Sequence, residues 1–357
     1  MERELKFNES LLEAHTQLLE TDPSVFLLGQ GVVDPKGAYG TTIGLEEKFG
    51  KERVMNTPFS ENAIMGIAIG AAIKGMRPIL TFKRVDFLLL AMDQLINNAS
   101  KWYYMFGDQM KVPLVLRLVI GRGWGQGPQH SQSLHGLFAA IPGLKVVMPS
   151  TPYDAKGLLI SATKDNNPVV FLEHRWLHHT HGPVPEEMYE VPIGKAHIIQ
   201  QGNDLTLVTC SHMSLEGRKA CKILEEQGVS VEHIDLRSVK PLDKETLIKS
   251  VRKTGRLLVA DPDWKSCGVA AEVIASLSEE AFNDFKAPPA RVTYPDRPSP
   301  SSWALANHYY PSAKSIALQA FRTLRMPSKA QHILEKLLEH RNSAPLDVPD
   351  ASFTGPF

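Results

Sequence analysis

The sequence predicts an α/β protein that consists of two doubly wound domains, each a mainly parallel sheet with helices on both faces. Short apolar runs, typical of strands, alternate along the chain with longer segments of helical periodicity. These runs are continuously apolar, as expected for parallel strands that are buried on both faces. A chain of 357 residues is also too long for one small core and suits two domains of ordinary size.

The first half of the chain begins with a helix and continues with alternating strands and helices. An amphipathic helix over residues 6–21 leads to a buried strand at Val25–Gly29. The next helix, over residues 61–75, is apolar almost all round and is therefore expected to be buried. Gly66 and Gly70 lie four apart on it and would let another backbone approach closely. The expected elements that follow are a strand at Arg77–Phe82, an apolar helix over 88–104 and a strand at Pro113–Ile120.

The rest of the chain continues the alternation in two parts. A polar, proline-containing stretch between about residues 174 and 195 interrupts the pattern and indicates a domain boundary. We therefore expect a first domain over 1–190, a second over 195–326, and a C-terminal extension over 327–357. The extension is expected to hold a helix at 328–341 and a proline-rich tail with the apolar anchors Val348, Phe353 and Phe357. The remaining expected strands are 144–149, 168–173, 205–210, 230–236 and 256–261, and the remaining helices are 152–164, 214–227, 243–253 and 268–282.

The composition excludes several classes of protein. Lys and Arg together number 39, as do Asp and Glu, so the formal net charge is zero and no footprint of a nucleic-acid or membrane-surface protein is present. No apolar run reaches the ~20 residues that span a bilayer, and the charged first residues lack an apolar signal segment. Cys210, Cys221 and Cys267 form neither a metal-ligand nor a disulfide pattern, which favours reduced core thiols. We expect a cytoplasmic protein.

Glu61 is the first candidate for a functional side chain. Ser60 is in the position of a helix N-cap, and Glu61 lies in the first turn of the helix that follows. An acidic residue there is equally explained by its favourable interaction with the helix dipole, so the pattern alone leaves a purely structural role open.

His130 is the second candidate and lies in a glycine-rich loop, residues 121–132. Four glycines alternate there with other residues after a buried strand, but this is not the dinucleotide-binding spacing, and Pro128 opposes the start of a helix. His130 follows the carboxyl end of a predicted parallel strand, the edge at which open α/β sheets bind ligands. A hydrogen bond that stabilises the loop is the alternative role.

A cluster of histidines near the domain boundary is a third candidate. A metal site is one interpretation of it. The cluster lacks the regular helical spacing or the added carboxylate of a catalytic metal site, and its surroundings are rich in proline. We therefore favour a loop with exposed imidazoles. The histidines are His174, His178, His179 and His181.

A series of ordered segments is shared with one enzyme family over about residues 3 to 326. They include Asn56-Thr-Pro-Phe-Ser-Glu61, Gly66–Ala72, Ala91–Asn97, His130–Ser133, Pro142–Gly157 and Asp235–Asp243. The chain thus resembles the β subunit of the thiamine-diphosphate-dependent 2-oxoacid dehydrogenase decarboxylase component, of the pyruvate and branched-chain types, in the transketolase superfamily. The resemblance implies a pyrimidine-binding first domain and a transketolase C-terminal-like second domain.

The resemblance also implies roles for four residues. In the family, the glutamate at the Glu61 position hydrogen-bonds the aminopyrimidine ring of thiamine diphosphate and so promotes deprotonation of the thiazolium carbon. The aromatic side chain at the Phe87 position packs on that ring. Gln30 stands where the family usually has an acidic residue and is also expected to bind the cofactor. The histidine at the His130 position lies in the substrate channel, where it assists proton transfer or acyl transfer to a lipoyl carrier.

Bound cations and a partner subunit are further implications of the resemblance. The family's diphosphate and Mg²⁺ motif, Gly-Asp-Gly followed later by Asn, is absent, and the nearest match, Gly107-Asp-Gln, lacks the second glycine. Because a bound diphosphate needs Mg²⁺ and its oxygen ligands, a separate α subunit is expected to supply them in an α2β2 assembly that also contains β–β contacts. A structural potassium ion is common in the family, and its carbonyl ligands would correspond to Leu114, Ala162, Asp165 and Asn167.

Several departures from the family pattern concern the substrate. Lys83 and Arg84 lie in a segment that is usually of the Met-Thr-Phe type, and Asp261-Pro262 replaces an acidic pair. If Lys83 and Arg84 point inward, they make the substrate side more positive, which suggests a substrate with an extra anionic or strongly polar group, or a non-standard acyl acceptor. If they face solvent or the α subunit, this hypothesis loses its basis.

The predicted function is that of a β subunit of a heteromeric 2-oxoacid dehydrogenase. It decarboxylates a 2-oxoacid and passes the acyl group to a lipoyl carrier, so a lipoyl acyltransferase is a further expected partner. Two alternatives remain open: a carbon–carbon bond-forming transferase (carboligase) that uses the same cofactor, and a non-catalytic β-like subunit. A nicotinamide-dependent dehydrogenase is disfavoured, because no Gly-x-Gly-x-x-Gly follows the first strand.

Overall fold

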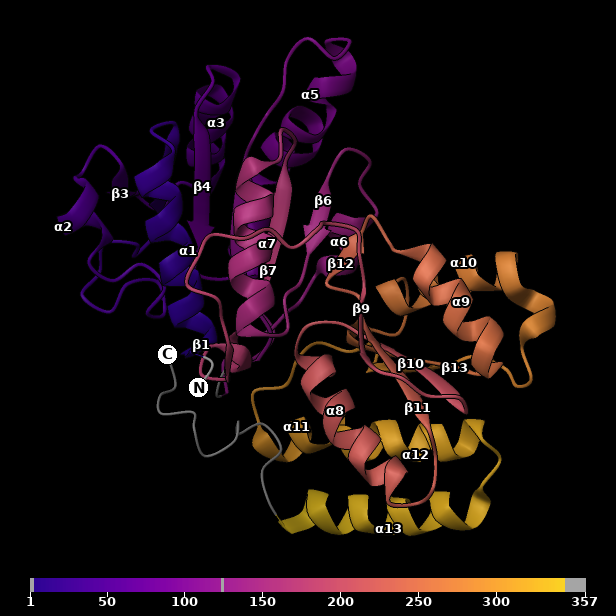
Figure 1. Cartoon of the computed structure of the whole chain (residues 1–357). Coiled ribbons are helices and arrows are strands. Elements are labelled where there is room, and N and C mark those ends of the chain that lie inside the picture. Colours follow the sequence, from indigo (N-terminus) through magenta and orange to yellow (C-terminus); the bar gives the residue numbers. More distant parts are fainter. Residues whose placement is uncertain (1–2, 123–124, 344–357) are drawn as a thin grey trace. The chain divides into compact units, whose positions relative to one another are not determined.

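The computed structural model describes residues 3–122 and 125–343, which form two compact units (Figure 1). Of the described residues, the first unit contains residues 3–121 and Leu137–Ile193, and the second contains Arg122, residues 125–136 and residues 194–343. Each unit has a mainly parallel sheet with flanking helices. The predicted α/β class with two doubly wound domains is therefore confirmed.

Within the first unit, the strand order is β6-β7-β5-β4-β2-β3, and all of these neighbours pair in parallel. The middle strands are buried along their whole length, which agrees with their continuously apolar sequences. Their carboxyl ends meet at one edge of the sheet, where Gly29 pairs with both Asn56 and Thr81. The strands are β2 (Val25–Gly29), β3 (Val54–Asn56), β4 (Arg77–Phe82), β5 (Val115–Ile120), β6 (Lys145–Val147) and β7 (Val169–His174).

The helices predicted over 6–21, 61–75 and 152–164 are present, whereas α2, η3 and α6, which begins in the second unit, were not predicted, and the prediction differs from the structure between residues 85 and 105. There the expected helix over 88–104 is divided into short α, 3-10 and π segments. An apolar run predicts burial but cannot show where the hydrogen-bond register changes from i+4 to i+3 or i+5. The helices are α1 (Phe7–Thr21), α2 (Leu45–Phe49), α3 (Glu61–Ile73), α4 (Val85–Leu88), η1 (Leu89–Ala91), η2 (Gln94–Ala99), α5 (Ser100–Met105), α6 (His135–Ala139), α7 (Pro152–Lys164) and η3 (Arg175–Leu177), and β1 (Glu4–Lys6) pairs antiparallel with β8 (His181–Pro183).

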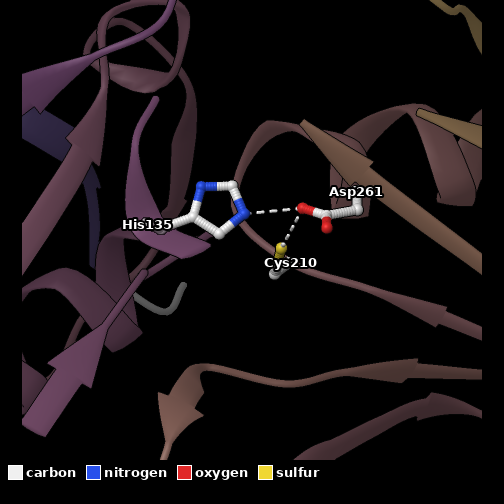
Figure 2. Close-up of side chains that lie close together, drawn as sticks. All are labelled: His135, Cys210 and Asp261. Carbon is white, nitrogen blue, oxygen red and sulfur yellow. Dashed lines mark hydrogen bonds and ion pairs between the residues drawn. The ribbon is translucent and has the colours of Figure 1, made fainter. Parts of the chain in front are cut away.

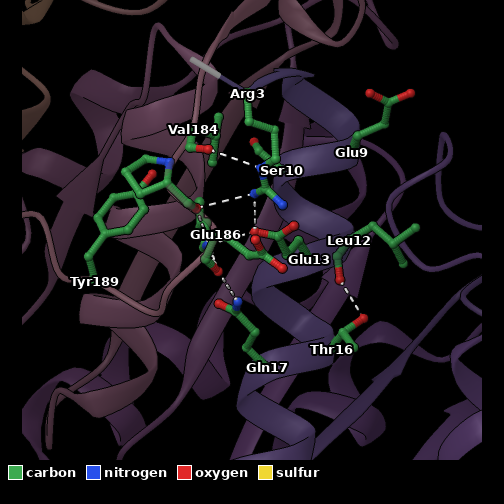
Figure 3. Close-up of polar contacts among 12 residues, drawn as sticks. Arg3, Glu9, Ser10, Leu12, Glu13, Thr16, Gln17, Val184, Glu186 and Tyr189 are labelled. Carbon is green, nitrogen blue, oxygen red and sulfur yellow. Dashed lines mark hydrogen bonds and ion pairs between the residues drawn. The ribbon is translucent and has the colours of Figure 1, made fainter. Parts of the chain in front are cut away.

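Polar contacts fasten helix α1 to the segment that follows β8 (Figure 3). Arg3 donates to the Val184 carbonyl at 3.2 Å and forms an ion pair with Glu13 at 2.7 Å. Glu13 Oε1 also accepts a hydrogen bond of 2.5 Å from the ammonium of Lys156, a fully buried lysine of α7. Gln17 donates to the Glu186 carbonyl at 2.7 Å. Because the buried lysine has a carboxylate partner, α1 and α7 can pack against each other without leaving an unpaired charge.

In the second unit, the strand order is β14-β13-β10-β11-β9, and only β9 is antiparallel to its neighbour. Helices α8, α12 and α13 lie on one side of this sheet and α9 and α10 on the other (Figure 1). The strands are β9 (His197–Gln200), β10 (Leu205–Thr209), β11 (Val231–Asp235), β13 (Leu257–Trp264) and β14 (Ala290–Tyr294), with a short β12 (Ser238–Lys240). The helices are α8 (His212–Glu225), α9 (Lys244–Thr254), α10 (Val269–Ala281), η4 (Phe282–Asp284), α11 (Trp303–Tyr309), α12 (Ala313–Thr323) and α13 (Pro327–Ser343).

The C-terminal extension contains the expected helix, which is α13. Its inner face, with Ala330, Ile333 and Leu337, joins the core formed by α8 and α12. The expected tail anchors Val348, Phe353 and Phe357 lie outside the described residues. Among the helices that the structure describes, none is both long and apolar enough to cross a membrane.

Helix α3 corrects one expectation, because it is not buried on all sides. Ile64 and Met65 face the core, whereas Ile67 is 60% exposed. A side chain built at Gly70 would meet no other atom within 4 Å. Uniform apolarity does not distinguish a helix buried in its own chain from one whose outer face packs on another chain.

Buried histidines lie in both units. His15 of α1 and His233 of β11 are fully buried, and His233 lies 2.8 Å from the Thr209 hydroxyl. Burial lowers the pKa of each imidazole to about 3. Since an unfolded histidine has a pKa of about 6.5, unfolding takes up a proton on each of them between these two pH values.

We predict that the free energy of unfolding falls as the pH decreases below about 6.5. Each of these histidines stabilises the fold fully above its unfolded pKa, and that contribution is lost toward the folded pKa of about 3. One such histidine costs about 2 kcal/mol at pH 5 relative to pH 8. Replacing His233 by Gln should lower the slope of unfolding free energy against pH by up to about 1.4 kcal/mol per pH unit between pH 6 and 5. Urea denaturation at several pH values measures this slope.

The matched control is His332→Gln, which removes an exposed imidazole from α13 without changing the core. It should keep the wild-type slope. An unchanged slope in His233→Gln would contradict the prediction, since it would mean that His233 takes up no proton on unfolding.

Candidate active site

The candidate site lies at the carboxyl edge of the first unit's sheet, where open α/β sheets bind ligands. The chain leaves β2 at Gln30, and it leaves β3 through a short segment that reaches Glu61. Phe87 lies in α4, which follows β4. Parallel pairing of these three strands places their exits at the same edge. Gln30, Glu61 and Phe87, all predicted from the sequence, therefore follow strands that end at one edge of one sheet.

Glu61 and Gln30 are in direct contact. Glu61 is the first residue of α3 and is only 9% exposed, and its Oε1 accepts a hydrogen bond of 2.8 Å from Nε2 of Gln30. An amide can donate to a carboxylate at any pH, whereas an acidic residue at position 30 could do so only when protonated. The helix N-terminus also favours the negative charge of Glu61. Ser60 occupies the N-cap position as predicted, but its side chain makes no capping hydrogen bond.

The backbone on both sides of Gln30 is held by close contacts. A side chain at Gly29 would lie 2.2 Å from the Thr81 carbonyl oxygen, and Gly29 has a positive φ of 155°. The Gly31 amide donates to the Asn56 side chain at 2.7 Å. These contacts tie the exit of β2 to β3 and β4, and so they orient Gln30 relative to Glu61.

Phe87, the predicted stacking residue, is half-buried in the short helix α4. The start of this helix is fixed by Arg84, whose guanidinium donates to the Gly121 carbonyl at 3.0 Å and is buried. The neighbouring Lys83 is partly exposed and forms an ion pair of 2.9 Å with Asp34. The charge of Lys83 is therefore offset, and only Arg84 still supports the hypothesis of a more positive substrate side.

A buried ion pair supports the sheet beneath this edge. Arg117 of β5 and Glu173 of β7 are both fully buried and 2.7 Å apart, and Arg117 also donates to the Thr41 hydroxyl in the loop after β2. Nε2 of His178 lies 3.6 Å from Glu173. Although burial opposes ionisation, Arg117 and His178 hold the pKa of Glu173 at about 2. Burial lowers the pKa of His178 itself to about 4.

The histidine cluster differs from its expected exposed arrangement. His174 and His178 are fully buried, and only His181 is exposed. The described residues of this cluster do not form a group with metal-ligand geometry. Their burial was not visible in the sequence, because a proline-rich segment can cover the end of a strand as well as leave it open.

The expected potassium ligands are engaged in other hydrogen bonds. The Leu114 carbonyl accepts from the Val169 amide at 2.9 Å, and the Ala162 carbonyl accepts from the Asp165 amide at 3.3 Å. The guanidinium of Arg77 donates to the Asp165 carbonyl at 3.0 Å. Carbonyl oxygens keep a second lone pair, but a positive guanidinium at Asp165 opposes a potassium ion at that oxygen. The fourth expected ligand is Asn167, whose amide donates to the Asp165 side chain at 2.9 Å.

His130 belongs to the second unit and is half-buried. Its amide donates to the Gly127 carbonyl at 3.3 Å, so part of the glycine-rich loop is a tight turn. Gly123 and Trp124 of that loop lie outside the described residues. The structure thus brings Glu61 and Gln30 together and places His130 on a different unit.

One group of buried side chains was missed by sequence reasoning. His135, Cys210 and Asp261 lie within 4.8 Å of one another in the second unit, as Figure 2 shows. Nε2 of His135 is only 2.6 Å from Oδ1 of Asp261, which is the length of a direct hydrogen bond and leaves no space for an ion between them. Burial raises the pKa of the Cys210 thiol well above its usual value, away from the thiolate that metals bind. Cys221 is also buried, but Cys267 is exposed, so the expectation of core thiols was wrong for Cys267.

Comparison with known proteins agrees with this architecture. The transketolase pyrimidine-binding domain matches residues 3–179, and the transketolase C-terminal domain matches residues 194–316. A solved split-gene transketolase, described as an inactive β4 tetramer, has a TM-score of 0.74 over 90% of this chain and 99% of its own, at 21% identity. The fold is therefore that of a transketolase-like protein with a pyrimidine-binding and a C-terminal domain.

Curated relatives narrow this class. The β subunit of the acetoin:2,6-dichlorophenolindophenol oxidoreductase of Cupriavidus necator is 42% identical over 91% of this chain and 99% of its own length. The pyruvate dehydrogenase E1 component subunit β of Acholeplasma laidlawii is 42% identical over 87% and 94%. The 2-oxoisovalerate dehydrogenase subunit β of Bacillus subtilis is 42% identical over 83% and 90%. The chain belongs to this family of 2-oxoacid dehydrogenase E1 β subunits.

We predict that breaking the buried ion pair destabilises the first unit strongly. Arg117→Met should lower the free energy of unfolding by about 3–5 kcal/mol, because it leaves the Glu173 carboxylate buried without its main partner. The double variant Arg117→Met/Glu173→Leu should recover most of this loss, since neither charge remains. Chemical denaturation at pH 7.5 measures both. A cost below about 1 kcal/mol for Arg117→Met would show that water or another group compensates Glu173.

Proposed function

We propose that this chain is the β subunit of a heteromeric thiamine-diphosphate-dependent 2-oxoacid dehydrogenase. It would act in the decarboxylation of a 2-oxoacid and in the transfer of the acyl group to a lipoyl carrier. The observation that carries this proposal is the buried Glu61 carboxylate, which Gln30 orients at the carboxyl edge of the sheet. Family membership and the pyrimidine-binding domain that includes both residues support the same conclusion.

The arrangement fits an aminopyrimidine ring. One oxygen of Glu61 accepts from Gln30, and the carboxylate can hold a ring nitrogen's proton with the other. The low exposure of Glu61 strengthens such a contact, because little water competes for it. Phe87 supplies an apolar face for the ring. Thiamine diphosphate, when bound, supplies the nucleophilic carbon of this class of reaction.

His130 is proposed to serve the later steps. Its imidazole is half-buried on a turn of the second unit, and an imidazole side chain has one nitrogen that can donate a proton and one that can accept it. In the proposed reaction it assists proton transfer or transfer of the acyl group to the lipoyl carrier.

A separate α subunit completes the proposed site. The chain lacks the Gly-Asp-Gly motif, so the Mg²⁺ ligands for the diphosphate would come from this partner. The first unit offers large exposed apolar side chains for this contact, namely Phe59 (87%), Ile67 (60%), Leu90 (67%) and Tyr104 (88%), of which Phe59 and Ile67 flank Glu61 in sequence. Exposed apolar side chains of this size are typical of interaction surfaces. The open backbone at Gly70 allows close approach of another helix.

Other parts of the proposal follow from the family resemblance and the sequence pattern. One prediction is a potassium ion near Leu114, Ala162, Asp165 and Asn167. The domain limits 1–190 and 195–326 and the extension 327–357 are also predictions. So are the β–β contacts, the lipoyl acyltransferase partner and a cytoplasmic location. The buried reduced thiols Cys210 and Cys221 are compatible with a reducing compartment.

The relatives suggest a second candidate substrate class. Two of them, from Cupriavidus necator and Bacillus subtilis, are β subunits of acetoin:2,6-dichlorophenolindophenol oxidoreductases. Oxidative cleavage of an α-hydroxyketone would use the same residues and cofactor without loss of CO₂. A screen of 2-oxoacids against α-hydroxyketones, with 2,6-dichlorophenolindophenol as acceptor, distinguishes the two. Turnover of neither class, together with condensation of aldehydes, would favour a carboligase.

We predict that thiamine diphosphate binds to the assembled protein but not to this chain alone. Calorimetry with Mg²⁺ on the isolated chain, and on the chain co-expressed with an α subunit of this family, tests the divided site. In the assembly, Glu61→Gln should retain binding within about tenfold and lower turnover by at least about 100-fold, because an amide cannot hold the ring proton as a carboxylate does.

The control for this test is Glu47→Gln, which removes an exposed acid from α2. It should leave binding and turnover unchanged. Tight binding by the isolated chain would contradict the divided site, and binding by neither preparation would favour the non-catalytic subunit.

We also predict that the exposed face of α3 holds the α subunit. Ile67→Arg places a charge in the centre of this apolar face and should weaken association at least about tenfold, measured by analytical ultracentrifugation. The matched control is Leu338→Arg, which adds the same charge at an exposed apolar position of α13. Equal effects of the two variants, or no effect of Ile67→Arg, would place the interface elsewhere.

A further inference from the structure

The glycine-rich loop that carries His130 is held by the second unit. Its sequence belongs to the segment that matches the pyrimidine-binding domain, yet residues Arg122–Gly136 pack with the C-terminal unit. The described part, Arg122 and 125–134, contains neither helix nor strand before α6 begins at His135. Because this segment has no helix or strand of its own, contacts of its side chains contribute largely to its position.

The downstream anchor of this loop is His135. Its imidazole is fully buried between two carboxylates of β13, with Nε2 2.6 Å from Oδ1 of Asp261 and Nδ1 3.7 Å from Oδ2 of Asp263 (Figure 2 shows the Asp261 contact). The next amide, that of Gly136, donates to Oδ2 of Asp263 at 3.2 Å. The two carboxylates therefore hold two consecutive residues, His135 and Gly136, at the start of α6, directly after the loop.

The two carboxylates are themselves held in place. Oδ2 of Asp261 accepts from the Ala270 amide at 2.8 Å, in the first turn of α10, and the Cys210 thiol lies 3.8 Å from its Oδ1 (Figure 2). Oδ1 of Asp263 accepts from the Trp264 amide at 2.8 Å. Because both groups are fixed by backbone donors, they define the position of His135 and do not merely follow it.

The upstream anchor is an aromatic contact. The guanidinium of Arg122 lies 4.1 Å from the ring centroid of Tyr310, and the Ser131 side chain hydrogen-bonds the same tyrosine. Gly127 packs so closely on Ser301 that a side chain there would lie 2.3 Å from the Ser301 hydroxyl. Contacts therefore hold the chain before His130, at Arg122 and Gly127, and directly after it, at Ser131.

The backbone between His130 and His135 is under strain. Leu134 has a positive φ of 54°, a left-handed conformation that non-glycine residues seldom adopt. It is also buried. Such a conformation persists where the surrounding contacts over-determine it, and here the contacts of His135 and Gly136 follow directly.

Electrostatics make the downstream anchor an ion pair. Although burial opposes the charge, Asp261 and Asp263 raise the pKa of His135, so that its imidazolium form is favoured. The third titratable group facing it is the Cys210 thiol, which burial keeps neutral. A charge-assisted hydrogen bond of 2.6 Å inside a buried site is strong and directional.

We propose that His135, held by Asp261 and Asp263, is a positioning residue that clamps the glycine-rich loop and so determines where His130 presents its imidazole. This inference rests on the proposed function in assigning His130 to the later steps. The clamp acts on the loop and not on Glu61, so its loss should impair lipoyl-dependent transfer while cofactor binding is retained. Asp261, which belongs to the Asp261-Pro262 departure from the family pattern, is thereby assigned a function in the clamp.

The experiment uses the assembled protein with its α partner and thiamine diphosphate. His135→Gln and Asp263→Asn should each make the peptides that span residues 125–136 exchange amide hydrogens at least tenfold faster. Lipoyl-dependent kcat should fall at least tenfold, with the Kd of thiamine diphosphate changed less than threefold. Adding His135→Gln to His130→Ala should cause no further loss of kcat, because both changes remove the same function.

A pH series supplies a readout that general loss of packing would not produce. The folded pKa of His135 is raised, so the clamp is complete below the unfolded value of about 6.5 and is lost as the pH rises through the folded value. Protection of the loop, corrected for intrinsic exchange, should therefore decline with rising pH in the wild type and be flat in His135→Gln. The matched control, Cys210→Ser, keeps a donor toward Asp261 and should behave as the wild type.

Three outcomes would overturn the clamp. They are unchanged loop exchange and kcat in His135→Gln, a parallel loss of cofactor binding, and stoichiometric zinc in the wild type that disappears in Cys210→Ser, which would make the cluster a metal centre. Failure of the proposed function is seen separately, as a wild-type assembly that turns over no 2-oxoacid. The exchange measurement tests the clamp in that case as well, since it needs no activity.

Discussion

Parallel pairing of β2, β3 and β4 is the constraint on which the candidate site depends. It brings three strand exits to one edge, where Gly29 closely approaches Thr81 and the Gln30 side chain donates to Glu61 at the start of α3. Glu61 is then buried with a neutral donor against it. A carboxylate in such surroundings is suited to hold a proton on a heterocyclic ring, and the rest of the first unit serves to keep this geometry rigid.

Both units contain buried charged side chains that have a partner of opposite charge. Arg117 and Glu173 connect two central strands and the loop after β2, and His135 with Asp261 connects a loop to β13. In each case an opposite charge and backbone or hydroxyl donors satisfy groups that would otherwise destabilise the fold. Buried pairs of this kind specify one arrangement of segments, because any other arrangement leaves a charge without a partner.

Much of this could be predicted from the sequence. The strands at Val25–Gly29 and Arg77–Phe82 follow from apolar runs, and the helix at Pro152–Lys164 follows from its helical periodicity. The ordered segments identified the family. Glu61 and Gln30, both predicted to bind the cofactor, form a hydrogen bond with each other. The His135 cluster could not be found this way, because its members are more than 50 residues apart in sequence and resemble no motif.

By itself, the sequence determined the α/β class, the alternation of strands and helices, and the family, since these depend on local periodicity and on ordered motifs. Only the tertiary structure decided that α3 keeps an apolar face exposed, that His174 and His178 are buried, and that the loop with His130 packs on the second unit. The physical reason is that periodicity reports which faces are apolar, whereas the partner that covers a face, or the carboxylate that meets a histidine, is chosen by packing between distant segments.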